Sequence, residues 1–248
     1  MLLYCCYTPA HEILYRKIFL PSVPEGFTVR PSRLNIAGPG DFLSGEFLRC
    51  IREKLGLVVA SIAKNPGSVV VWSDVDIQFF DLRSVDLQAA LGSSSAESDL
   101  LFQSESRRAT EVNTGFFVCR CSPSTLKFFQ TVHSELGARP EENEQMVINR
   151  LLRQARPPRA GNDHPLSWNY LPPSFYARSH GWPPPRKLAL YHANSTKGHD
   201  AIGQKLTQFS ELARLQRGGA PARMWSVLRR IPRKIKSTLI QMGVMKSG

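Results

Sequence analysis

Short apolar runs alternate with longer amphipathic segments along the first 210 residues of the chain. The apolar runs are rich in β-branched and aromatic side chains, which is typical of strands. Strands are predicted at residues 2–7, 28–30, 69–72, 100–102, 113–120 and 188–191. Apolar positions at steps of three and four predict helices at residues 11–19, 42–63, 81–91, 122–136 and 141–156. This alternation predicts an α/β sandwich with a mainly parallel sheet.

Carboxylates follow directly after the apolar run at residues 69–72. Ser73, Asp74 and Asp76 stand where this strand leaves the sheet, and the apolar pattern resumes at Ile77. A short β-branched run is typical of an interior parallel strand, and the ligands of open α/β sheets collect at the carboxyl ends of such strands. We therefore expect the functional site at the Asp74/Asp76 pair.

The two aspartates suit a hard divalent cation. Residues two apart in an extended segment point the same way, so Asp74 and Asp76 either share one ion or diverge if the strand ends between them. Mg²⁺ and Mn²⁺ bind carboxylate oxygens and fill their remaining positions with water or phosphate. The alternative is structural: Asp74 caps the next helix, and Asp76 pairs with an arginine.

The positive charge of the chain is concentrated at its C-terminal end. The formal net charge is +12, but residues 213–248 contain nine Lys and Arg and no acidic residue, which leaves 23 basic and 20 acidic groups on residues 1–212. This distribution gives no reason to expect nucleic acid as a partner. We expect one α/β domain over residues 1–212 and a basic, partly amphipathic tail over residues 213–248.

The tail has the pattern of a helix that lies on a membrane surface. Its apolar residues follow steps of three and four from Met224 to Met242, and Arg and Lys fall mainly on the opposite side. This pattern favours binding to anionic lipid, with a kink at Pro232. A solvated terminal helix is the alternative.

Cysteine content and hydropathy point to the cytoplasm. The five cysteines are odd in number and lack the spacing of a zinc site, so we expect reduced thiols. The N-terminal residues lack the basic segment of a signal peptide, and no apolar stretch approaches the ~20 residues that span a bilayer. We expect a cytoplasmic protein, peripheral at the inner face of the membrane if its tail binds lipid.

Four short motifs follow predicted strands or begin a predicted helix: SDVD at 73–76, NTGFF at 113–117, NEQ at 143–145 and YHAN at 191–194. Together they resemble the nucleotide-diphospho-sugar transferase family of GT-A-fold glycosyltransferases, over roughly residues 1–205. The resemblance implies a Rossmann-like, three-layer α/β sandwich. It also implies a sugar-nucleotide donor bound through Mn²⁺ or Mg²⁺ and a glycan, lipid-linked or protein acceptor.

The resemblance assigns roles to residues near each motif. Asp74, Asp76 and His192 would hold the metal, which neutralises charge as the nucleoside diphosphate leaves. Glu144 and Gln145 would act with the aspartates as catalytic residues. The resemblance also implies a set of residues that contact the donor. In chain order they are Tyr7, Thr8, Lys54, Ser73, Asp74, Asn113, Gly115, Lys197 and Gly198.

Several of these roles have a structural alternative. Tyr7 can pack in the core, and Lys54 can be an ordinary exposed helix lysine. His192 can form a hydrogen bond to a loop instead of binding a metal. Asn113 opens a motif that also fits a plain turn into a strand. Glu144 stands where the family often carries Asp, so it can instead stabilise the helix dipole from the solvent.

Two other functions fit an Asp-x-Asp motif after a buried strand. In haloacid-dehalogenase-like phosphatases the first Asp is a nucleophile, but a Thr or Val usually stands two residues past the second Asp, where this chain has Gln78. A catalytically silent sugar- or membrane-binding module would bind its ligand without turnover. The function we expect is a metal-dependent glycosyltransferase whose acceptor site is built largely from the aromatic segment 165–182.

Overall fold

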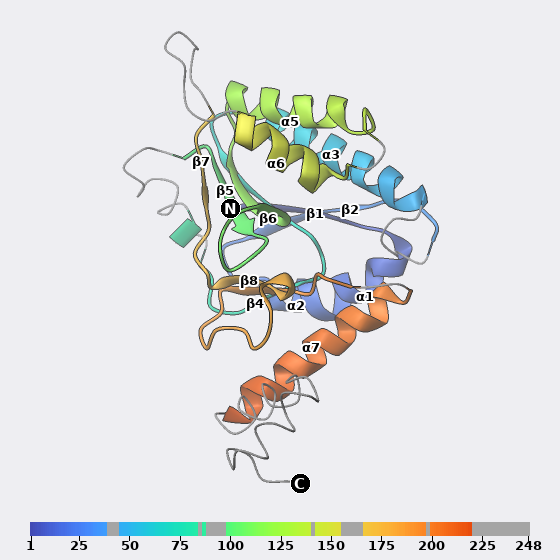
Figure 1. Ribbon diagram of the computed structural model, residues 1–248, viewed down its shortest axis with the longest axis vertical. Coiled ribbons are helices and arrows are strands. Elements are labelled where there is room, and N and C mark those ends of the chain that lie inside the picture. The colour runs from blue at the N-terminus through green and yellow to red at the C-terminus, as the bar shows by residue number, and fades with distance from the viewer. Residues whose placement is uncertain are drawn as a thin grey trace, which may run out of the picture.

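A six-stranded sheet forms the centre of the computed structural model (Figure 1). The structure describes residues 1–38, 45–83, 86–87, 98–139, 142–154, 166–196 and 199–219. In space the strands follow the order β2 (Thr28–Arg33), β1 (Leu2–Tyr7), β3 (Val69–Ser73), β6 (Val112–Arg120), β5 (Leu100–Ser104) and β7 (Trp168–Tyr170). β6 runs antiparallel to both of its neighbours, and the other five strands share one direction. The prediction of a mainly parallel sheet is confirmed.

β3 lies inside this sheet, as its apolar sequence predicts. It pairs with β1 in parallel and with β6 in antiparallel orientation, so that Val70 lies opposite Leu2 and Trp72 lies opposite Phe117. The strand has neighbours on both edges and packed layers on both faces, and Trp72 is therefore almost fully buried. The paired and buried strand β3 therefore holds the start of the segment that follows it, which contains Asp74 and Asp76.

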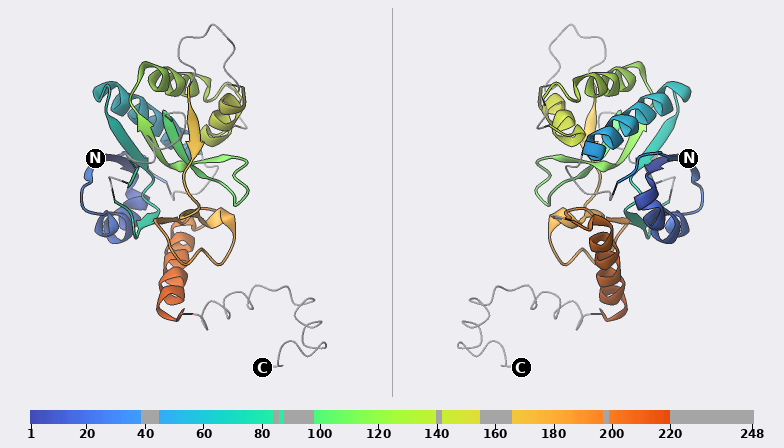
Figure 2. Two further views of the ribbon diagram at one scale, coloured as in Figure 1. Left: turned by 90° about the vertical axis from the view of Figure 1, so that its left-hand side faces the viewer. Right: turned by 90° about the vertical axis from the view of Figure 1, so that its right-hand side faces the viewer.

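Three helices cover one face of the sheet (Figures 1 and 2). They are α3 (Gly45–Lys64), α5 (Pro123–Glu135) and α6 (Glu144–Gln154). Leu55, Phe129 and Ile148 from these helices belong to one buried apolar cluster with the side chains of the sheet. α5 begins after a capping box formed by Ser122.

A short helical segment, a second sheet and α7 (Ala201–Arg217) lie on the other side of the central sheet (Figure 1). The helical segment runs through η1 (Pro9–His11), α1 (Glu12–Leu14), η2 (Tyr15–Phe19) and α2 (Leu20–Ser22). The second sheet has the order β4 (Ile77–Phe79), β9 (Leu190–His192) and β8 (Phe175–Ala177), and η3 (Arg178–His180) follows β8 along the chain. Phe19, Tyr191 and Phe209 share a second apolar cluster with the central sheet. The layers confirm the predicted sandwich.

α6 is tied to the central sheet by Asn149. The buried amide of this residue accepts a hydrogen bond from the Val112 N–H at 2.8 Å and donates to the Val112 C=O at 3.0 Å. It thereby satisfies both backbone groups of the first residue of β6. This bond pair fixes the start of β6 against the helix that begins at Glu144.

Several local predictions differ from the structure. β2 continues through Pro31 to the end of the strand, because an edge strand tolerates a missing N–H. β7 and β8 lie inside the Pro-rich segment 157–186, where three-residue strands are too short to show a periodic pattern. The helix predicted at 81–91 is wrong for residues 81–83, which are not helical. Residues 86–87 are helical, and residues 84–85 and 88–91 lie outside the described residues.

The structure also bears on the expectations drawn from composition. All five cysteines are free thiols, as expected, and burial raises the pKa of Cys5 to about 12. α7 continues to Arg217, past the expected domain end at residue 212, and residues 220–248 of the expected tail lie outside the described residues. Within the described part of the chain, no helix combines the length and the hydropathy needed to cross a bilayer.

Candidate active site

Residues 73–76 carry the chain from the central sheet to the second sheet. The Asp74 N–H donates to the Gly115 C=O of β6 at 2.6 Å, and the Asp76 C=O accepts from the Ala193 N–H at 2.9 Å. The backbone of each aspartate is therefore held by a different part of the fold. The two carboxylates lie at the junction of the two sheets.

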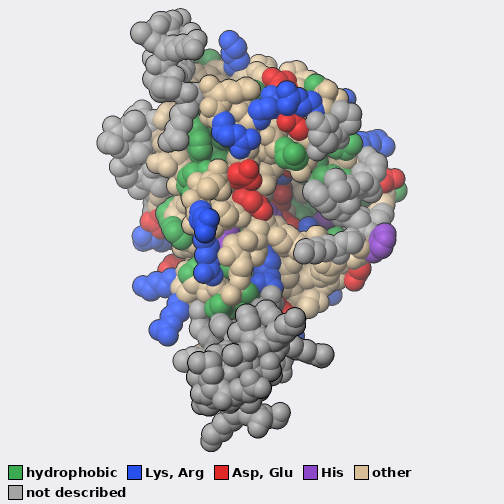
Figure 3. Space-filling model, viewed as in Figure 1, with side chains coloured by type: hydrophobic (Ala, Val, Ile, Leu, Met, Phe, Trp, Pro, Cys, Tyr) green, Lys and Arg blue, Asp and Glu red, His purple; other side chains and the backbone are tan. Residues whose placement is uncertain are grey.

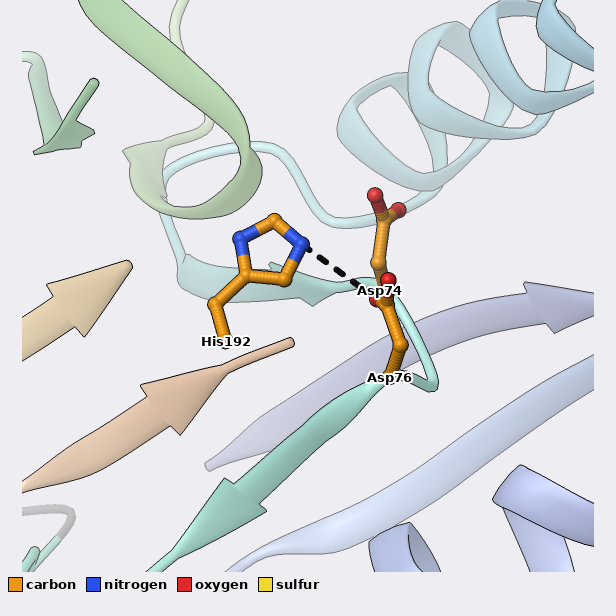
Figure 4. Close-up of side chains that lie close together, drawn as sticks. All are labelled: Asp74, Asp76 and His192. Atoms are coloured by element: carbon orange, nitrogen blue, oxygen red, sulfur yellow. Dashed lines mark ion pairs between the residues drawn. The ribbon is translucent and has the colours of Figure 1, made fainter. Parts of the chain in front are cut away.

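Asp74, Asp76 and His192 form a cluster of three potential metal ligands (Figure 4). His192 ends β9 and pairs with Ile77, the residue after Asp76. One ligand atom from each of the three side chains lies within 4.8 Å of the other two. Asp76 and His192 are buried, and Asp74 is partly exposed. The two aspartates thus converge rather than diverge.

Lys54 reaches the cluster from α3. Its Nζ lies 2.8 Å from Asp74 Oδ1 and 3.4 Å from Glu144 Oε1. Burial by itself lowers the pKa of a lysine, but the two carboxylates outweigh it and hold the pKa of Lys54 above its ordinary value. Lys54 is therefore a buried, charged group, and neither the exposed lysine nor the solvated Glu144 of the structural alternatives is found.

Lys205 reaches the cluster from α7. Its Nζ lies 2.7 Å from Asp76 Oδ2, while His192 Nε2 lies 3.3 Å from Asp76 Oδ1. Burial alone raises the pKa of a carboxyl group, but Lys205 and His192 hold the pKa of Asp76 well below its usual range. Burial and the nearby Lys205 also lower the pKa of His11 to about 4, so His11 adds no charge at neutral pH.

The charges of this cluster do not balance. Two ammonium groups face three carboxylates, which leaves one negative charge without a positive partner inside the group: Lys54 and Lys205 against Asp74, Asp76 and Glu144. The Lys54 Nζ contacts Oδ1 of Asp74, and the Lys205 Nζ contacts Oδ2 of Asp76, while Oδ1 of Asp76 faces the His192 ring. In the space-filling view, acidic side chains gather at the middle of the face with basic side chains beside them (Figure 3).

Gly115 is required by the position of the His192 ring. A Cβ atom built at residue 115 would overlap Cε1 and both nitrogens of the imidazole. The sequence motif suggested that Gly115 lies against the donor sugar. In the structure its missing side chain makes room for the imidazole, and its N–H donates to the side chain of Asn113 at 2.9 Å.

Two adjoining cavities meet at the aspartates. The first has a volume of about 180 Å³ and extends from the aspartates to Tyr7 and Thr8 at the end of β1. The second has a volume of about 320 Å³ and extends to Asn113 and Gln145. Lys205 lines both cavities. Together they form a continuous concave site around the charged cluster.

The structure brings most of the predicted site residues to these walls: Tyr7, Thr8, Lys54, Asp74, Asp76, Asn113, Gly115, Glu144, Gln145 and His192. Ser73 is different, because it is fully buried and its Oγ donates to the Asp74 C=O at 3.0 Å. It supports the aspartate motif from behind. Lys197 and Gly198 lie outside the described residues.

Three residues of this site were not predicted from the sequence. Lys205 pairs with Asp76, Gln103 contacts His192 at 3.0 Å, and Glu105 lines the second cavity and accepts a hydrogen bond from the Asn113 amide. None of them belongs to a motif, and Lys205 and Gln103 meet their partners only through packing between distant segments. The sequence offered one weak indication of these residues, which was the basic side chain of Lys205 near the start of α7.

A family profile matches most of the chain. The profile describes nucleotide-diphospho-sugar transferases and covers residues 27–209, which include both aspartates and His192. No curated protein sequence shows a significant match to the chain.

Two solved structures share the fold. A glycosyltransferase involved in the glycosylation of the major capsid of PBCV-1 aligns with a TM-score of 0.56 and 12% identity, over 84% of this chain and 98% of that one. The apo form of the glycosyltransferase GlyE of Streptococcus pneumoniae TIGR4 aligns with a TM-score of 0.50 and 10% identity, over 85% of this chain and 63% of that one. At this identity the likeness concerns the fold.

The Gly115→Ala variant should lose stability. Its methyl group has to displace the buried His192 ring, so we expect the free energy of unfolding to fall by about 1–3 kcal/mol in urea titrations. Gly56→Ala in α3 is the matched control, since a Cβ there meets nothing within 4 Å. That change should stabilise the protein by about 0.5–1 kcal/mol. Equal stability of Gly115→Ala and wild type would show that Gly115 does not confine the ring.

Proposed function

The chain belongs to the nucleotide-diphospho-sugar transferase family and is a glycosyltransferase, and we propose that its activity depends on a divalent cation held by Asp74, Asp76 and His192. The observation that supports this most directly is the cluster itself, in which three ligand atoms lie within 4.8 Å of one another. Two carboxylates and one imidazole suit Mn²⁺, and Mg²⁺ is the alternative.

The charge of the cluster agrees with this donor set. The unbalanced carboxylate favours an additional cation. A bound divalent ion would supply Lewis-acid stabilisation of the departing diphosphate. The chain's own Lys54 and Lys205 hold the aspartates in place, so the ligand oxygens are oriented before the donor arrives.

The two cavities suggest how the bound donor is oriented. We assign the nucleoside to the cavity that ends at Tyr7 and Thr8, and the sugar to the cavity lined by Asn113 and Gln145. Amide side chains can both donate to and accept from sugar hydroxyls. The reactive bond, between the anomeric carbon and the diphosphate, then lies near the aspartates. It breaks as that carbon bonds to the acceptor oxygen, which loses its proton, and the nucleoside diphosphate leaves.

A third cavity is our candidate for the acceptor site. It has a volume of about 370 Å³ and is lined by residues of the segment 171–185, including Pro173 and Tyr176. Ser104 and Ser106 line this cavity, while Glu105 between them lines the donor cavity. The two cavities therefore lie on opposite sides of one short segment. This supports the expected acceptor site in the aromatic region.

The family assignment decides against the phosphatase alternative. Such a phosphatase uses the first aspartate as a nucleophile, whereas Asp74 here is paired with the buried Lys54 at 2.8 Å. The site is also better suited to transfer than to silent binding, because its charged groups converge where the two donor cavities meet.

The metal role is tested by Asp74→Asn and Asp76→Asn. We expect each variant to lose at least 100-fold in Mn²⁺ affinity, measured by isothermal titration, and to lose the metal-dependent rise in melting temperature with the true sugar nucleotide. Asp86→Asn is the control, because Asp86 is exposed and pairs with Arg83. Unchanged Mn²⁺ affinity and turnover in folded aspartate variants would remove the metal role.

The acceptor cavity is tested by Pro173→Trp, which adds bulk at its exposed wall. We expect the KM for a glycan acceptor to rise at least tenfold, while hydrolysis of the sugar nucleotide without acceptor stays within twofold of wild type. Gln130→Trp on the exposed face of α5 is the control. An unchanged acceptor KM would place the acceptor elsewhere.

The tail from residue 213 onwards is proposed to bring the enzyme to an anionic membrane near a lipid-linked acceptor, on the basis of its sequence pattern alone. We expect the full chain to sediment with vesicles that contain phosphatidylserine, and a chain ending at Gly218 to remain in solution. Excess salt should release the full chain. Equal sedimentation of the two proteins would refute the proposal.

A further inference from the structure

Gln103 is a fully buried polar residue between the two sheets. It lies on β5 of the central sheet, and its side-chain amide contacts two residues of the second sheet. Nε2 donates to the Phe175 C=O at 3.2 Å, and Oε1 lies 3.0 Å from Nδ1 of His192. Both ends of the amide are therefore occupied inside the protein.

The chemistry of these partners fixes the orientation of the amide. The Phe175 carbonyl can only accept a hydrogen bond, so the NH₂ group of Gln103 must face it. The carbonyl oxygen of Gln103 then faces His192 and can itself only accept. Nδ1 of His192 must therefore carry a hydrogen, whichever way the amide atoms are labelled.

This assignment determines what the other ring nitrogen presents. In a neutral imidazole with a hydrogen on Nδ1, Nε2 carries a lone pair. Nε2 lies 3.3 Å from Asp76 Oδ1, which is also an acceptor. Two acceptors at this separation repel each other unless a positive charge lies between them, as a proton or as a metal ion. With the hydrogen on Nδ1, the Nε2 lone pair is placed to bind a cation together with Asp76.

The pairing of β5 and β6 provides the space for this arrangement. Phe102 lies opposite Phe117, but Gln103 lies opposite Asn113, so residues 114–116 have no partner on β5. Gly115 lies in this irregular stretch, against the His192 ring. Irregular pairing of this kind re-aims side chains next to functional sites. Here it lets the imidazole enter between the sheets and reach Gln103.

We propose that Gln103 is a positioning residue, which accepts the Nδ1 hydrogen of His192 and so directs the Nε2 lone pair toward the metal. This inference rests on the metal site of the proposed function and adds a residue to it. Residues that orient metal-bound histidines in this way typically contribute about 10–100-fold to metal affinity.

Two substitutions separate this role from simple packing. Gln103→Leu has a similar size but removes both hydrogen bonds, and we expect it to weaken Mn²⁺ binding by about 10–100-fold in titration calorimetry. Gln103→Glu keeps an acceptor for Nδ1, loses the donor to Phe175 and adds a carboxylate beside His192, so its Mn²⁺ affinity should fall by no more than a few-fold from wild type. Equal losses in the two variants would assign Gln103 to joining the sheets and overturn the proposal.

A double-mutant cycle tests whether Gln103 acts through His192. In a His192→Ala background, Gln103→Leu should cause no further loss of Mn²⁺ affinity, because the ring that it orients is gone. A loss of the same size in both backgrounds would contradict the proposal. The melting temperature of every variant is measured without metal, so that unfolding is not mistaken for weak binding.

The wild-type protein offers a test that does not depend on variants. Long-range ¹H–¹⁵N spectra in mildly alkaline buffer, where a histidine ring is ordinarily neutral, should show hydrogen on Nδ1 of His192. A bare Nδ1 would overturn the proposal. If the proposed function is wrong, the wild-type protein itself binds no Mn²⁺, and this result differs from a failure of the Gln103 proposal. If wild type binds Mn²⁺, Asp74→Asn does not, and Gln103→Leu binds like wild type, only the inference on Gln103 fails.

Discussion

A buried carboxylate requires positive charge beside it, and the structure of this protein is organised around that requirement at Asp76. The carboxylate is almost inaccessible to water and is paired with Lys205 at 2.7 Å. Removing one partner of such a pair typically costs about 3–5 kcal/mol. α7 therefore has to lie where Lys205 can reach Asp76, and Phe209 and Leu212 in the core hold the helix there.

The same requirement explains why the site lies between two sheets. Asp74 is held from the central sheet and paired with Lys54 of α3. Asp76 directly precedes β4 of the second sheet, where it pairs with His192 of β9 and with Lys205 of α7. Each layer of the sandwich thus supplies part of one charged cluster. The proposed divalent ion would join this cluster beside the two lysines. The pre-oriented carboxylates then lose little freedom when the donor binds.

Sequence patterns predicted the sheet, the long helices and the main members of the site. Asp74, Asp76 and His192 stand at strand ends, so local patterns and the family resemblance were enough to place them. Gln103, Glu105 and Lys205 were missed because their roles depend on pairing across the fold. The irregular register between β5 and β6, for example, decides that Gln103 meets His192, and no local pattern encodes it.

The second sheet was missed for a related reason. Its strands have three residues each, and β4 pairs with β9, which lies more than one hundred residues further along the chain than β4. Short strands carry little periodic signal, and their pairing is set by the packing of the whole domain. The residues that a motif marks were therefore predictable, whereas the residues that orient and neutralise them became visible only with the fold.

The central claim is that this charged cluster holds a divalent cation for sugar transfer. Anomalous diffraction from crystals grown with Mn²⁺ and a sugar nucleotide tests it most directly. The account predicts a single manganese peak between Asp74, Asp76 and His192, in contact with the donor diphosphate and with Lys205 still bound to Asp76. A donor bound in the cavities with no manganese peak at these three side chains would contradict it.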